Sequence, residues 1–105
     1  MMGVTVPVTT LDDVLEGLGR VDILKIDVEG HELKVLEGGL RSLRNKKIKN
    51  ILFESNPRML KLASTSENEV SGLLSGFGYR ESARIRHSGG ADERTYYDCL
   101  MTLAN

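Results

Sequence analysis

The chain is poor in aromatic residues and in cysteine, and it contains no tryptophan. Its 105 residues include two phenylalanines and three tyrosines, too few to favour a surface on which nucleic-acid bases stack. The single cysteine, Cys99, excludes an intramolecular disulfide, and its place in the run Tyr97-Asp98-Cys99-Leu100-Met101 predicts a buried, unreactive thiol. No second cysteine accompanies a histidine at the spacing of a zinc site, so we expect no metal there.

The sequence also lacks an excess of charge of one sign and a long hydrophobic run. Lys and Arg number 14 and Asp and Glu 15, a net charge of −1, which gives no electrostatic basis for binding nucleic acid or an anionic membrane. No apolar run reaches the ~18 residues of a membrane span, and the first residues do not resemble a secretory signal. We therefore expect a cytoplasmic chain whose residues 1–105 form one domain.

Apolar patterns predict an α/β sheet. Val4–Val8 alternates as a short extended segment, and Val21–Val28 (VDILKIDV) is nearly continuous in apolar residues, as in a strand covered on both faces of a parallel sheet. Ile48–Phe53 is a second such strand. Two later strands, Tyr79–Arg86 and Thr95–Leu103, are joined by a predicted loop with the glycine and aspartate content of a turn.

Helices are predicted between these strands. Thr10, Asn56 and Ser66 are side chains of the type that caps a helix start. From His31 onward, leucines at positions 33, 36, 40 and 43 form one apolar helical stripe. The resulting order of strands and helices predicts a layered α/β fold that ends in an antiparallel hairpin.

Three carboxylates end the predicted parallel strands. Asp27 and Glu29 close the first strand and Glu54 closes the second, which is where open α/β sheets bind ligands. Such a cluster could supply a general base, because like charges in a partly dry crevice raise one another's pKa, or it could bind a divalent cation. Asp27 is the strongest candidate, since an acid inside an apolar run needs a partner or a task. Lys25 is its possible structural partner.

Other polar residues near this cluster have simpler interpretations. Acids at helix starts commonly stabilise the helix dipole, the interpretation we favour for Glu32. His31 could move protons beside the acids, although a single exposed histidine at a helix start usually has no such task. His87 falls in the predicted glycine-containing loop (residues 87–92) and is a weaker candidate still.

Four segments, in this order, resemble the carboxyl-terminal half of FkbM-type S-adenosylmethionine-dependent methyltransferases: Thr10–Leu15 (TLDDVL), Leu24–Gly39 (LKIDVEGHELKVLEGG), Ile51–Glu54 (ILFE) and Leu73–Tyr79 (LLSGFGY). The resemblance extends over about residues 8–103. It implies a partial Rossmann-like class I methyltransferase sheet, with parallel strands ending in an antiparallel hairpin. It also implies methyl transfer to a hydroxyl of a small molecule (a sugar, lipid or secondary metabolite), with Asp27, Glu29 and Glu54 as catalytic residues.

One part of the family pattern is missing. No Gly-x-Gly turn follows an amino-terminal strand, because only 20 residues precede Val21, and the glycine pairs at 38–39 and 89–90 are placed elsewhere. We therefore expect a truncated domain that is inactive alone and does not bind S-adenosylmethionine measurably. Val21–Val28 would then be a sheet edge covered by Val4–Val8, by a second copy or by a partner chain. The alternative to an enzyme is a non-catalytic module that pairs with a partner chain.

Overall fold

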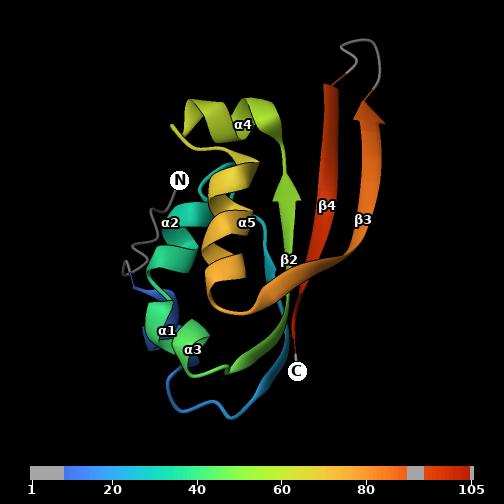
Figure 1. The fold of residues 1–105 in the computed structure, drawn as a ribbon. Coiled ribbons are helices and arrows are strands. Elements are labelled where there is room, and N and C mark those ends of the chain that lie inside the picture. Colours follow the sequence, from blue (N-terminus) through green and yellow to red (C-terminus); the bar gives the residue numbers. More distant parts are fainter. Residues whose placement is uncertain (1–8, 90–93, 105) are drawn as a thin grey trace, which may run out of the picture.

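The computed structural model describes residues 9–89 and 94–104, in which helices pack on one side of a four-stranded sheet (Figure 1). The strands are β1 (Val21–Ile26), β2 (Ile48–Ser55), β3 (Tyr79–Gly89) and β4 (Arg94–Leu103), in the spatial order β1-β2-β4-β3. The β1–β2 pair is parallel, and β4 pairs antiparallel with both β2 and β3. This confirms an α/β sheet whose parallel strands are followed by an antiparallel hairpin.

Five helices alternate with the strands: α1 (Leu11–Leu15), α2 (Glu32–Glu37), α3 (Leu40–Arg44), α4 (Pro57–Leu62) and α5 (Glu67–Gly76). The expected capping side chains are in place. Thr10, Asn56 and Ser66 each accept a hydrogen bond from the backbone N–H three residues later, at 3.2–3.3 Å. These bonds satisfy donors that the first turn of a helix leaves free.

The single helix predicted from His31 onward is wrong: α2 and α3 are separate helices that meet at Gly38-Gly39. Helix α1 occupies the space beside the break. The Asp12 N–H donates to the Gly38 carbonyl at 3.0 Å, and a Cβ at Gly39 would lie 2.6 Å from Leu11 Cδ2. The glycine pair lets the two chain segments approach closely, so a tertiary contact interrupts the leucine stripe.

The expectation that β1 is covered on both faces is also wrong for the described residues. Ile26 is buried, but Lys25 is exposed and the Ile23 side chain is 57% exposed. Side chains alternate along a strand, so Leu24 and Ile26 face the helices while Ile23 and Lys25 lie on the opposite face. That second face has no helix over it in Figure 1; we call it the open face.

The core lies between the sheet and the helices. Its fully buried side chains come from helices α2 to α5 and from strands β2, β3 and β4, and they include Leu36, Leu43, Ile51, Leu60 and Tyr79. Cys99 is buried with them, and burial raises the pKa of its thiol to about 12. The prediction that this thiol is buried is therefore confirmed.

The hairpin end of the sheet differs from its sequence-based description, whereas the β1 end agrees with it. His87 and Ser88 continue β3, with His87 opposite Tyr96, so the predicted loop begins later than His87. β1 pairs only with β2 among the described residues and is a sheet edge, as expected. Val4–Val8, proposed to cover that edge, lies outside the described residues. No helix in the described ranges is long and apolar enough to cross a membrane.

Candidate functional site

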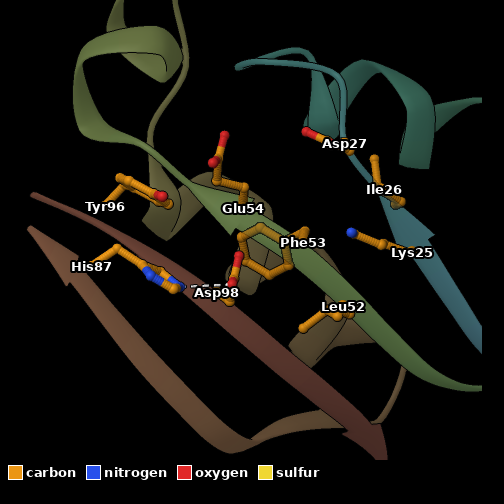
Figure 2. Close-up of a pocket in the computed structure, with 9 residues that line it drawn as sticks. All are labelled: Lys25, Ile26, Asp27, Leu52, Phe53, Glu54, His87, Tyr96 and Asp98. Atoms are coloured by element: carbon orange, nitrogen blue, oxygen red, sulfur yellow. Dashed lines mark hydrogen bonds and ion pairs between the residues drawn. The ribbon is translucent and has the colours of Figure 1, made fainter. Parts of the chain in front are cut away.

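A cavity of about 200 Å³ opens on the open face at the carboxyl ends of β1 and β2. Figure 2 shows Asp27 and Glu54 at its upper rim, Lys25 and Leu52 further down the strands, and the side chains of β3 and β4 across from them. The parallel register aligns Lys25 with Leu52, which brings the ends of the two strands to the same level. The crevice position expected for a ligand site in an α/β sheet is therefore formed.

The position of Glu54 in the cavity raises the pKa of its carboxylate. Its side chain is half-buried, and the strand pairing places it opposite Asp98. Burial raises the pKa of Glu54, and the nearby charges of Asp27 and Asp98, followed by those of Glu32 and Glu29, raise it further. A carboxylate whose pKa moves toward neutrality accepts a proton more readily than an ordinary one.

Three further side chains line the cavity: His87, which was a weak candidate from the sequence, and Tyr96 and Asp98, which were not singled out. His87 Nε2 lies 2.8 Å from an Asp98 carboxylate oxygen, and the His87 ring stacks on Tyr96 with centroids 4.7 Å apart. His87 comes from β3, and the other two come from β4. A signal was available for Asp98, an acid inside an apolar run like Asp27, and strand alternation places Tyr96 on the same face.

The sequence-predicted residues separate into two groups. Asp27, Glu54 and Lys25 line the cavity, whereas Glu29 and His31 do not. Glu29 lies in the connection after β1, where its φ is +49°. Because Glu29 does not line the cavity, its catalytic role stays a prediction. The described residues show no ion pair between Lys25 and Asp27.

Glu32 has a structural task. Its side chain is fully buried, and its two carboxylate oxygens accept hydrogen bonds from the Gly30 N–H at 3.1 and 3.2 Å. The carboxylate thereby fixes the turn that leads from β1 into α2. This contact agrees with the structural interpretation favoured from the sequence.

A bound cation finds little support in the acidic cluster. Within residues 9–89 and 94–104, no group of three or more His, Cys, Asp or Glu side chains is arranged to hold a metal ion. The carboxylates of the cavity come from three parts of the chain: Asp27 directly after β1, Glu54 in β2 and Asp98 in β4.

S-adenosylmethionine, the methyl donor that the sequence resemblance implies, does not fit the cavity at the strand ends by itself. The cavity is smaller than the ~300–1,000 Å³ typical of ligand pockets. Gly30 follows β1 with φ +99°, but a Cβ there would lie 2.3 Å from the Met59 carbonyl oxygen. The backbone of α4 therefore packs directly on the turn after β1.

The family comparison bears on most of this site. A model of the methyltransferase FkbM domain matches residues 2–81, which include Asp27, Glu29 and Glu54 and end within β3. The cavity residues His87, Tyr96 and Asp98 lie beyond the match. Searches of curated proteins and of solved structures gave no match. Since the matched segment spans most of the chain, the chain belongs to the FkbM methyltransferase domain family.

Proposed function

We propose that this chain forms the acceptor side of a methyltransferase that modifies a hydroxyl of a small molecule, such as a sugar, lipid or secondary metabolite. The observation that carries the proposal is the raised pKa of Glu54 beside Asp27 at the strand ends. A hydroxyl placed in the cavity gives its proton to a Glu54 carboxylate oxygen, which makes the hydroxyl oxygen more nucleophilic. Asp27 orients the hydroxyl and keeps the Glu54 pKa high.

Separate substitutions can distinguish the roles of Glu54 and Asp27 in a complete FkbM-domain enzyme that has both residues. At neutral pH, Glu54→Gln is expected to lower kcat about 100-fold, because the proton acceptor is lost. Asp27→Asn removes a charge that raises the Glu54 pKa, so the acidic limb of the pH–rate profile should move to lower pH. An unchanged rate in Glu54→Gln would contradict the assignment of the base.

We also propose that the chain does not bind S-adenosylmethionine by itself and is inactive alone. The proposal rests on the small volume of the cavity at the strand ends. Calorimetric titration of the chain with S-adenosylmethionine is expected to give no saturable heat. Saturable binding at micromolar concentrations would contradict this part of the proposal while leaving the role of Glu54 open to its own test.

A second candidate function is a module that pairs with another chain through the β1 edge. The observation that favours it is the unpaired edge of β1 among the described residues, together with the exposed Ile23. Strand edges of this kind readily accept another strand. Light scattering after size-exclusion chromatography tests the version in which the partner is a second copy, and a monomer at high concentration would contradict that version.

A further inference from the structure

A second cavity, of about 380 Å³, lies on the helix side of the sheet at the end of β2. Successive side chains of a strand point to opposite faces, so Glu54 serves the open face while Ser55 faces the helices. The walls are formed by Ser55, by Leu60 and Lys61 of α4, by Thr65 between α4 and α5, and by Arg84 and Tyr97 of the hairpin. The volume lies in the range of small-molecule sites.

Two hydroxyl groups in this wall lack hydrogen-bond partners. Ser55 Oγ and Thr65 Oγ1 are both buried, and neither has a partner among the residues that the structure describes. Ser55 as a whole is 1% exposed. Its hydroxyl helps to lower the pKa of Glu67 without reaching hydrogen-bond geometry. Buried hydroxyls are normally paired, because an unpaired one loses its bonds to water without replacement.

The partly buried charged groups of the cavity compensate one another, and the remaining charged residue, Lys61, is exposed. Arg84 Nη2 lies 3.0 Å from Glu67 Oε1 and 2.7 Å from Glu81 Oε1, and the guanidinium sits 4.8 Å from the centre of the Tyr97 ring. Burial alone would raise the pKa of Glu67, but the hydrogen bond and the charge of Arg84, together with contributions from Ser55 and Cys99, outweigh this effect and lower the pKa. Glu67 is therefore ionised and paired with Arg84, and neither group offers a free charge to an ionic ligand.

We propose that this cavity binds a small uncharged molecule with an apolar ring and one hydroxyl group, of the phenol class. The ring packs against Leu60 and Tyr97, and the ligand hydroxyl exchanges hydrogen bonds with Ser55 or Thr65. The site goes beyond the proposed methyl transfer, because it lies on the other face of the sheet from Glu54 and Asp27. Its test uses no methylation assay, so the two proposals succeed or fail separately.

The test compares 4-methylphenol with toluene, which differ by one hydroxyl group, as probes of the unmodified chain. Titrations followed by ¹H–¹⁵N correlation spectra should shift the amide signals of Leu60, Thr65 and Tyr97. We expect 4-methylphenol to bind about fivefold more tightly than toluene, the effect of one net hydrogen bond. Equal affinity for the two probes, or no change at these amides, would overturn the proposal.

Two variants examine the hydroxyls themselves. Combining Ser55→Ala with Thr65→Val should abolish the preference for 4-methylphenol while toluene binding persists. The melting temperature of the ligand-free variant should rise by about 4 °C, because a buried unpaired group is removed. Ser82→Ala is the matched control, since the Ser82 hydroxyl is exposed and bonded at 2.6 Å to Thr102 Oγ1. A variant that is less stable than the parent would show that the hydroxyls are paired and would refute the proposal.

Discussion

Asp12 connects two helices through one carboxylate. Its oxygens accept hydrogen bonds from the N–H of Arg41 at 3.2 Å, from the N–H of Ser42 at 2.8 Å and from the Ser42 hydroxyl at 2.7 Å. Burial alone would raise the pKa of Asp12, but these hydrogen bonds and the charge of Arg41 lower it below its usual value of 3.8. The ionised carboxylate thus caps the start of α3 from a position on α1.

Replacing this carboxylate should destabilise the fold in a pH-dependent way. At pH 7, Asp12→Ala is expected to lower the free energy of unfolding by about 1–2 kcal/mol, the usual cost of a lost helix cap. Because the folded-state pKa lies below the unfolded-state pKa, the stabilisation is complete above the usual value and disappears as the pH falls through the folded-state value. Urea unfolding at pH 7 and near pH 3 measures both effects.

Asp13→Ala provides the control for this experiment. Asp13 neighbours Asp12 in α1 but is exposed, and its carboxylate accepts only a 3.3 Å hydrogen bond from Thr9 among the described residues. We expect a change below about 0.5 kcal/mol. An Asp12→Ala effect that is no larger than this, or one that is the same at both pH values, would show that the cap does not stabilise the fold.

At the level of single residues, the sequence was informative about strand ends and uninformative about the hairpin. Asp27 and Glu54 each lie near the end of an apolar run that forms a parallel strand, so they could be predicted to approach the same rim. His87 could not, because the glycines at 89 and 90 favoured an early loop. The pairing of His87 with Asp98 depends on the register of β3 with β4, which local sequence does not specify.

Among the connections between elements, the turn from β1 to α2 is the most constrained. Gly30 has a positive φ, its N–H is held by Glu32, and the missing Cβ leaves room for the Met59 carbonyl of α4. Any larger side chain at this position must displace backbone rather than a flexible side chain. This position therefore couples the end of β1 to the placement of α4.

Adding a methyl group at position 30 should destabilise the fold. Gly30→Ala is expected to lower the free energy of unfolding by at least about 2 kcal/mol, because it combines a strained φ with a backbone clash. Gly72→Ala is the matched control, since Gly72 lies inside α5 with no atom within 4 Å of a built Cβ. That variant should gain up to about 1 kcal/mol from helix propensity. Similar effects at both positions would contradict the close packing of Gly30 on α4.

Helix starts were predictable because a cap is a local arrangement of a side chain and a backbone N–H three residues later. The break between α2 and α3 was not predictable in the same way. The leucine repeat continues across Gly38-Gly39, and only the approach of Leu11 and the Asp12 carboxylate from α1 explains the interruption. The cavity behind Ser55 is likewise a product of tertiary packing, because nothing in the local sequence shows that its hydroxyl lacks a partner.

In the whole molecule, helices cover one face of the sheet and leave the other face exposed. Helices cover the inner face of the sheet, while Ile23 and Ile85 on the open face are 57% and 59% exposed. Leu52 and Leu100 are paired across β2 and β4 and lie half-buried between them. Polar residues interrupt this apolar band, since Asn50 pairs with Ile23 and Asp98 with Ile85. The exposed apolar side chains next to the free edge of β1 nevertheless favour association with another surface.

Self-association through this band is expected to depend on Ile23. In light scattering after size-exclusion chromatography, Ile23→Lys should lower the apparent mass toward that of a monomer at a concentration where the parent chain associates. Val14→Lys is the control, because Val14 on α1 is 56% exposed and lies away from the sheet. If both variants reduced association equally, general hydrophobicity rather than the open face would be responsible.

The number of residues in β2 determines which face of the sheet each side chain at its end points to. Glu54 belongs to the open-face cavity and Ser55 to the helix-side cavity. Deleting one residue between Ile48 and Phe53 would rotate both side chains to the opposite face. Length changes in this strand can therefore be accommodated only in steps of two, and a frame-preserving loss of one codon would damage both cavities at once.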